Sequence, residues 1–141
     1  MKLLILNGPN LNMVGRRAGN IYGDTTFKQF LPQLKNRFPQ VEIELYQSNI
    51  EGELIDKIQC AAGNYDAMIV NAGGYTHTSV AIGDALADAA ARGLRIVEVH
   101  ISSILAREEF RHTSFVAPHA EGSIMGFGLN SYVLAVEALL I

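Results

Sequence analysis

The sequence predicts an α/β domain built on a doubly wound, all-parallel sheet. Short apolar runs alternate along the chain with segments whose apolar residues recur at helical spacing. Most of these runs are continuously apolar, as expected for parallel strands that are covered on both faces. Polar residues and glycines follow the runs, at the sheet edge where open parallel sheets bind ligands.

Five strands are predicted. Residues 2–6 (Lys-Leu-Leu-Ile-Leu) form a short apolar run typical of a central strand. Residues 41–47 alternate in polarity and favour a more exposed strand at an edge of the sheet. Residues 67–70 form a third strand, which is again continuously apolar. Residues 95–101 form the fourth strand and residues 115–117 (Phe-Val-Ala) a short fifth one.

Four helices are predicted between and after these strands. The first spans residues 24–38 and begins at residues suited to N-capping, while Pro32 inside it predicts a kink or a late start. Helical spacing of apolar residues predicts a second helix over residues 51–63. The third spans residues 80–92 and ends at a glycine. The fourth spans residues 129–141.

The alternation of five strands with helices indicates a parallel sheet with helices on both faces. Crossover connections between parallel strands are right-handed almost without exception, which leaves few possible topologies. We favour the flavodoxin-like strand order 2-1-3-4-5. A chain of 141 residues fits one domain, so we take residues 1–141 as a single domain.

The last predicted helix is apolar nearly all the way round, and Glu137 is its one charged residue. The apolar ring consists of Tyr132, Val133, Leu134, Val136, Leu139 and Leu140. A helix that is apolar on every side is normally covered on more than one side. We therefore expect a homo-oligomer.

Composition and charge exclude several classes of protein. Hydrophobic residues make up 49% of the chain, and a net charge of -3 argues against a nucleic-acid-binding surface, which should be basic. No window approaches a transmembrane span, and the apolar N-terminal run is too short for a secretory signal. The single cysteine, Cys60, excludes an internal disulfide, fits a reducing compartment and is expected to be buried. We expect a cytoplasmic protein without membrane or nucleic-acid partners.

The most informative segment is the long connection after the first strand, residues 7–23. It is rich in glycine and asparagine. Arg16, Arg17 and Tyr22 give it a candidate anion binder and a candidate proton-transfer group. Loops of this length inside a compact domain are usually functional or disordered. The alternative interpretation is an ordinary solvated loop.

Glu98 and His100, on the fourth strand, form a second candidate site. Side chains two residues apart on a strand point to the same face. In a strand buried on both faces, a carboxylate and an imidazole are costly unless they are paired or functional. The carboxylate can hold the ring in one tautomer and raise its basicity. We interpret the two as a catalytic pair, with a satisfied core pair as the alternative.

Further polar groups follow the same strand ends. Asn71 ends the third strand and lies shortly before His77. After the fourth strand, the backbone N–H groups of Ile101 and Ser102 could hold a carboxylate or a phosphate. Arg111 lies in a charged run that could equally be a solvated face.

Other chemistries have less support. The chain has no phosphate-binding loop and no Gly-x-Ser-x-Gly elbow, and residues 126–128 (Gly-Phe-Gly) are only a fragment of a dinucleotide fingerprint. Glu98, His100 and His77 could in principle bind a metal, but no second clustered ligand pair accompanies them. No lysine falls in the predicted site, which disfavours a Schiff base. A flavodoxin-like binding module without turnover is the alternative to an enzyme.

Several specific stretches, taken in their order and spacing, carry a resemblance to a known family. They are Asn7-Gly8-Pro9-Asn10-Leu11-Asn12, Ile21-Tyr22-Gly23, Gln47-Ser48-Asn49 with Glu51-Gly52-Glu53, Tyr75-Thr76-His77-Thr78-Ser79, Val97-Glu98-Val99-His100 and Arg107-Glu108-Glu109-Phe110-Arg111-His112. Together they resemble the type II 3-dehydroquinate dehydratases, and the match runs nearly from end to end.

The resemblance implies a flavodoxin-like subunit assembled as trimers, commonly four of them in a dodecamer. It also implies the trans-dehydration of 3-dehydroquinate to 3-dehydroshikimate through an enolate, with no metal or organic cofactor. This step serves the shikimate pathway, which leads to chorismate and the aromatic amino acids, or the breakdown of quinate.

The resemblance further implies roles for individual residues. Tyr22 would be the base that removes a proton beside the substrate ketone, and Arg17, rather than Arg16, matches the family's loop arginine. His100 would protonate the departing hydroxyl, with Glu98 orienting it. The other groups implied to contact the substrate or a supporting water are Asn12, Asn71, His77, Arg111, the backbone of Ile101 and Ser102, and Asp84 of a neighbouring subunit.

Overall fold

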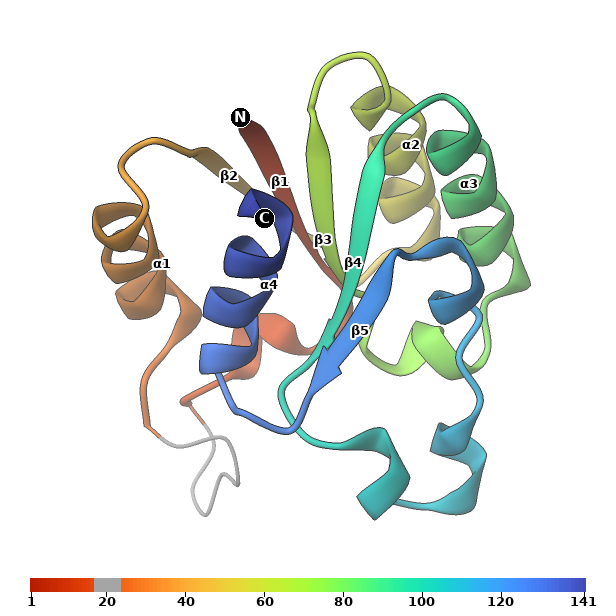
Figure 1. The fold of residues 1–141 in the computed structure, drawn as a ribbon. Coiled ribbons are helices and arrows are strands. Elements are labelled where there is room, and N and C mark those ends of the chain that lie inside the picture. Colours follow the sequence, from red (N-terminus) through yellow and green to blue (C-terminus); the bar gives the residue numbers. More distant parts are fainter. Residues whose placement is uncertain (17–23) are drawn as a thin grey trace.

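The sheet has five parallel strands in the order β2-β1-β3-β4-β5, which confirms the predicted flavodoxin-like order (Figure 1). The structure is a computed structural model that describes residues 1–16 and 24–141. The strands are β1 (Lys2–Asn7), β2 (Glu42–Gln47), β3 (Ala67–Asn71), β4 (Arg95–His100) and β5 (Gly122–Met125). The helices are α1 (Phe27–Arg37), α2 (Glu51–Ala61), α3 (Val80–Ala91) and α4 (Asn130–Leu140). β2 lies at an edge of the sheet, as its alternating polarity predicts.

Helices cover both faces of the sheet, with α1 and α4 on one face and α2 and α3 on the other (Figure 1). Alternate residues of each central strand enter the two hydrophobic cores. Ile5, Ile69 and Val99 pack beneath α1 and α4, whereas Leu6 and Val70 pack beneath α2 and α3. Because both faces are buried, the central strands have the continuous apolar character seen in the sequence.

The predicted position of the fifth strand is wrong. Residues 115–117 are not a strand, and β5 lies a few residues later, at Gly122–Met125. The hydroxyl of Ser114 accepts hydrogen bonds from the backbone N–H groups of Val116 and Ala117, which closes a turn. Val116 is apolar because it is a core residue of the α2 and α3 side. The sequence pattern does not indicate β5, because its first two residues are small and exposed. The strand is defined instead by its pairing with β4.

A capping box determines where α1 begins. The hydroxyl of Thr26 accepts a hydrogen bond from the backbone N–H of Gln29, and the side chain of Gln29 accepts one from the backbone N–H of Thr26. Because of these two bonds α1 begins at Phe27, and Pro32 does not delay its start.

The expectation that Cys60 is buried is wrong, because it lies on the exposed side of α2, opposite the core-facing residue Ile58. In the described parts of the chain, no helix has the length and apolar character to cross a bilayer.

The loops that follow β1 and β3 pack backbone against backbone at the carboxyl edge of the sheet. The N–H of Gly8 donates to the carbonyl of Asn71 at 2.7 Å. A Cβ atom on Gly8 would collide with the backbone of Ala72. Gly73 has a φ of +59°, and a Cβ atom on it would lie 2.9 Å from the Pro9 carbonyl oxygen. This close approach brings the polar ends of β1 and β3 together.

Candidate active site

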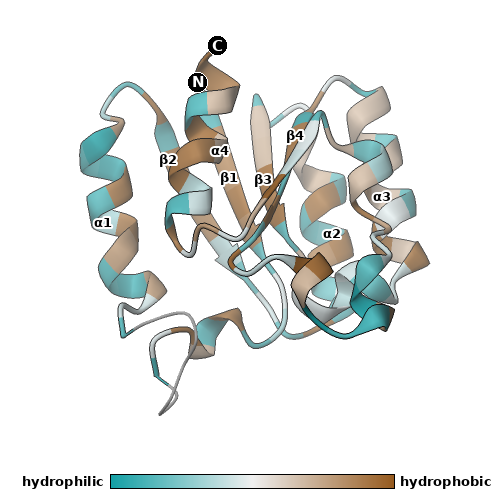
Figure 2. Ribbon diagram, turned by 60° about the horizontal axis from the view of Figure 1, so that its bottom comes forward, coloured by the Kyte–Doolittle hydropathy of each residue, from teal (hydrophilic) through white to brown (hydrophobic). Residues whose placement is uncertain are grey.

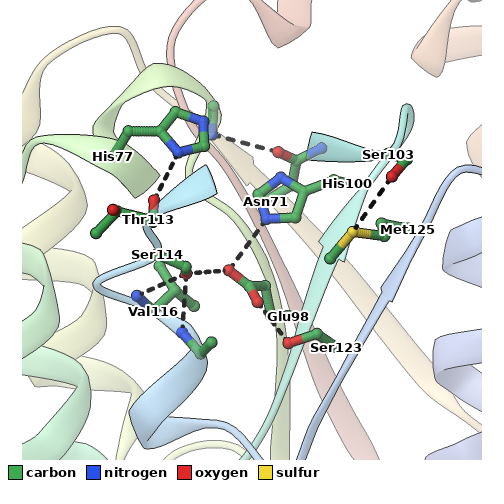
Figure 3. Close-up of polar contacts among 12 residues, drawn as sticks. Asn71, His77, Glu98, His100, Ser103, Thr113, Ser114, Val116, Ser123 and Met125 are labelled. Carbon is green, nitrogen blue, oxygen red and sulfur yellow. Dashed lines mark hydrogen bonds and ion pairs between the residues drawn. The ribbon is translucent and has the colours of Figure 1, made fainter. Parts of the chain in front are cut away.

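The centre of the candidate site is the pair Glu98 and His100 at the end of β4 (Figure 3). His100 Nε2 lies 3.0 Å from Glu98 Oε2, so the predicted contact between the two side chains is present. The side chain of His100 is only 7% exposed and that of Glu98 only 1%. They project to the face covered by α2 and α3, because Val97 and Val99 point to the other face.

Glu98 is held in its charged form by three hydrogen bonds. Besides His100, the hydroxyls of Ser114 and Ser123 donate to its two oxygens. Burial alone would raise the pKa of Glu98, but these hydrogen bonds outweigh burial and place the pKa below its ordinary value. An ionised carboxylate can only accept, so Nε2 of His100 carries the hydrogen of this contact. Nδ1 of His100 is then the atom available for proton exchange with a ligand.

His77 lies beside this pair. It ends a short 3₁₀ helix (Gly73–His77), and its ring stacks near the ring of His100 with a centroid separation of 6.3 Å and an interplanar angle of 22°. Nδ1 of His77 lies 2.8 Å from the carbonyl of Thr113, which can only accept, so Nδ1 carries the hydrogen. Nε2 is therefore left as an acceptor.

The pKa of His77 lies below its ordinary value. Burial is the largest cause, because it disfavours the charged ring. The Thr113 carbonyl acts in the opposite direction, while positive charge on His100, Arg111 and Arg107 lowers the pKa further. These effects place two arginines of the charged run within electrostatic reach of His77 and favour its neutral form.

A chain of buried polar groups crosses the other face of the sheet. The hydroxyl of Tyr132 donates to Oδ1 of Asn7 at 2.8 Å and accepts from Nδ2 of Asn71 at 2.9 Å. Oδ1 of Asn71 accepts from the backbone of Gly73 at 3.2 Å. Tyr132 is not among the predicted site residues, because in the sequence it belongs to the apolar ring of the last helix. Its hydroxyl was the available signal, because a buried tyrosine usually needs a polar partner.

The structure brings some of the predicted residues together and leaves others apart. Asn71, His77, Glu98 and His100 lie close to one another (Figure 3). Arg111 lies near His77, with its guanidinium 2.9 Å from Glu108 and over the ring of Phe110.

The other predicted residues have more varied positions. Ile101 is buried and Ser102 half-buried directly after β4, and Asn12 is exposed in a short helix (Leu11–Met13). Asp84 is exposed on α3, and its side chain makes no hydrogen bond or ion pair within residues 1–16 and 24–141. Arg17 and Tyr22 lie outside the described residues.

In the part of the chain that the structure describes, no three His, Cys, Asp or Glu side chains are grouped so that they could hold a metal ion. The lysines also lie elsewhere. Lys2 begins β1 and approaches Glu44, and Lys57 lies over the rings of Tyr46 and Tyr65. The described groups are thus a carboxylate-bound imidazole, a neutral imidazole and fixed amides, which suit acid–base chemistry on a polar ligand.

Comparison with known proteins gives a consistent result. The sequence model of the family "Dehydroquinase class II" matches residues 1–140. A 3-dehydroquinate dehydratase of Exiguobacterium sp. is 51% identical over 141 residues, which cover 99% of this chain and 94% of that protein. One from Prochlorococcus marinus is 48% identical, with 99% and 95% covered. The crystal structure of a type II dehydroquinase from Butyrivibrio crossotus superposes with a TM-score of 0.94 at 44% identity, covering 100% of this chain and 98% of that one.

Proposed function

This chain belongs to the class II dehydroquinase family, and from that premise we propose that it dehydrates 3-dehydroquinate to 3-dehydroshikimate. The structural observation that carries the proposal is the Glu98–His100 pair, since loss of a hydroxyl group requires a positioned proton donor. As a hydro-lyase of this kind, the protein would act in the shikimate pathway or in quinate breakdown.

The proposed base is Tyr22, assisted by Arg17, and this assignment is supported by the sequence resemblance. Removing a proton beside a ketone creates an enolate, so the site must stabilise negative charge. A phenol has an unperturbed pKa of ~10, so ionising it at neutral pH costs about 4 kcal/mol. A nearby guanidinium favours the tyrosinate and lowers this cost. Arg17 precedes Tyr22 by few enough residues for the two groups to meet in a folded loop.

The proposed acid is His100, which would protonate the hydroxyl as it leaves. Glu98 supports this role because its negative charge stabilises the imidazolium that must form before the proton is delivered. With Nε2 bound to Glu98, the proton would leave from Nδ1. After the transfer, His100 would return to the neutral tautomer that the carboxylate already favours.

The remaining roles are proposed by position in the family's motifs. Asn71 and His77, which lie beside His100, would bind hydroxyl groups of the substrate. The backbone of Ile101 and Ser102 would bind its carboxylate. The other proposed contacts are Arg111, Asn12 through a water, and Asp84 of a neighbouring subunit.

We further propose that the enzyme works without a metal or an organic cofactor and through an enolate rather than a Schiff base. Borohydride reduction in the presence of substrate tests the second point. Covalent labelling of a lysine would contradict the enolate route, and an unlabelled protein that still turns over is the expected result.

The proposed assembly is a trimer of subunits, with four trimers in a dodecamer, located in the cytoplasm. Hydrophobic residues extend over much of α4 (Figure 2). Leu134 and Leu140 are each 40% exposed in the single chain, which supports a covered surface there. Sedimentation equilibrium should give a molecular mass that is a whole multiple of the trimer mass, the mass of one chain being 15.3 kDa. A monomer mass would contradict the assembly.

The decisive experiment for the proposed function follows absorbance near the enone band when 3-dehydroquinate is added to purified protein. Only dehydration creates a conjugated enone, so a binding module without turnover would give no signal. We expect a steady rise that is the same with and without a chelator. A flat trace from the folded protein would refute the proposed activity, and a loss of rate with chelator would refute the metal-free mechanism.

A further inference from the structure

Tyr132 occupies a position that packing alone does not explain. Its side chain is 0% exposed, and its hydroxyl reaches from α4 to the carboxyl ends of β1 and β3. The ring packs edge-on against Phe27, with centroids 4.9 Å apart, and lies 6.2 Å from Phe30. These contacts involve only the ring, so the hydroxyl and its hydrogen bonds need a separate reason.

In each hydrogen bond around Tyr132, the donor and the acceptor can be assigned in only one way. The backbone N–H of Gly73 can only donate, so the Asn71 atom that faces it is the oxygen, and the amide cannot be flipped. The Asn71 atom that faces Tyr132 is therefore nitrogen, which donates to the phenolic oxygen. The one proton of the hydroxyl is left for Oδ1 of Asn7.

This arrangement determines what Asn71 can offer a ligand. Asn71 is only 4% exposed, and one of its N–H groups and one lone pair of its oxygen are used by Tyr132 and Gly73. One N–H and one lone pair are left, and their directions are set by the two existing bonds. Burial raises the pKa of the Tyr132 hydroxyl well above its ordinary value, so its proton stays in place at any working pH.

We propose that Tyr132 is a positioning residue that holds the amide of Asn71 in the orientation in which it binds a hydroxyl group of the substrate. The inference rests on the proposed function of Asn71. Tyr132 itself touches no substrate in this account, since it lies in the core behind the amide and acts through it.

The first test compares Tyr132→Phe with the wild type and with Tyr65→Phe in the enone assay. Tyr65→Phe is a matched control, because it also removes a hydrogen-bonded hydroxyl, but one bonded to Glu44 and remote from the site. We expect kcat/KM to fall about tenfold in Tyr132→Phe, as for a lost hydrogen bond of ordinary strength. Tyr65→Phe should keep the wild-type value. Equal kcat/KM in all three folded proteins would overturn the proposal.

The second test asks whether Tyr132 acts through Asn71. In the background of Asn71→Ala, the further change Tyr132→Phe should cause no additional loss of kcat/KM, because the amide that it positions is gone. Losses that multiply in the double variant would show an independent effect and overturn the proposal. A general loss of stability would not produce this pattern, because it would persist in the Asn71→Ala background.

A third measurement does not depend on turnover. The side-chain amide protons of Asn71, identified by their absence from Asn71→Ala, should exchange with solvent faster in Tyr132→Phe than in the wild type or in Tyr65→Phe. Unchanged exchange would overturn the positioning of Asn71, whether or not the protein dehydrates 3-dehydroquinate. A wild type without turnover would instead contradict the proposed function alone.

If Tyr132→Phe does not fold, Asn7→Leu provides the same test from the other end of the chain of hydrogen bonds. It removes the acceptor of the Tyr132 proton while keeping a side chain of similar size. The freed hydroxyl can then rotate, so Asn71 amide exchange should again be faster. Exchange at the wild-type rate in folded Asn7→Leu would count against the proposal.

Discussion

At the scale of single residues, the hydrogen bonds to Glu98 determine how a buried carboxylate remains charged. Because the pKa of Glu98 is lowered by folding, the stability that it contributes is present above its unfolded pKa of about 4.5. This contribution is lost as the pH falls through the lower pKa of the folded state. His100 and two serine hydroxyls together supply it.

Ser123→Ala should therefore destabilise the protein in a pH-dependent way. Removing one donor to a buried carboxylate should cost roughly 1 to 2 kcal/mol at neutral pH. The cost should shrink as the pH falls through the lowered pKa of Glu98, because the carboxylate becomes protonated there. Urea unfolding at several pH values measures it. Ser103→Ala is the matched control, because within residues 1–16 and 24–141 its hydroxyl bonds only the sulfur of Met125, at 3.9 Å. A cost independent of pH would contradict the charged state of Glu98.

The base assignment also belongs to this scale. Tyr22→Phe should abolish turnover while leaving the affinity for 3-dehydroquinate largely intact, because only the ionisable hydroxyl is lost. Steady-state kinetics and calorimetric titration measure the two properties separately. Tyr46→Phe, on β2, should behave as wild type. Near-normal turnover in Tyr22→Phe would mean that another group is the base.

At the scale of the elements, the segment that supplies Ser114 is held by close packing against α3. A Cβ atom on Gly83 would lie 2.8 Å from the carbonyl oxygen of Phe115, the residue after Ser114. Gly83 is thus a contact residue between α3 and the segment that supports Glu98.

Gly83→Ala should push this segment away from α3. We expect a loss of about 1–3 kcal/mol in the free energy of unfolding, as for other overpacked sites, together with a lower rate. The control is Gly52→Ala, at the second residue of α2, where nothing lies within 4 Å, so the added methyl group should not lower the free energy of unfolding. If both variants have the same stability, the close approach does not constrain α3.

The elements also show where sequence patterns are informative. β1, β3 and β4 are predicted nearly to the residue because burial on both faces makes them continuously apolar. β5 is misplaced because its short, half-exposed sequence has little pattern of its own, while the neighbouring Val116 is apolar for a different reason. Tertiary contacts determine whether such a segment becomes a strand, and the local sequence pattern carries no information about those contacts.

At the scale of the whole molecule, Asp84 is a predicted site residue whose proposed role requires a second subunit. It is exposed on α3, as expected if it serves a neighbouring subunit. Under the proposed assembly, a complete site contains His100 of one subunit and Asp84 of another.

Mixing two defective variants tests this sharing. His100→Ala and Asp84→Ala should each be strongly impaired, and unfolding and refolding them together should restore part of the activity, because some mixed sites contain both intact residues. The matched control mixes His100→Ala with Asn71→Ala, which remove groups of the same subunit and should not complement. Recovery in neither mixture would refute the shared site.

The candidate site was only partly predictable, for the same reason as the fold. Glu98 and His100 are two residues apart on one strand, so their contact follows from strand geometry. Ser114, Ser123 and Tyr132 reach the site from distant parts of the chain, and only the packed fold brings them there. The roles of Arg17 and Tyr22 stay predictions that depend on the family resemblance.

The sheet acts as a partition within the site, with the fixed asparagines on the side of α1 and α4 and the Glu98–His100 pair on the side of α2 and α3. Groups without shared partners contribute additively. The costs of Ser123→Ala and Tyr132→Phe in unfolding free energy should therefore sum in the double variant, which denaturant titration can measure. The hydrogen bonds around Glu98 and those around Asn71 can then be changed separately, whether by natural variation or by engineering.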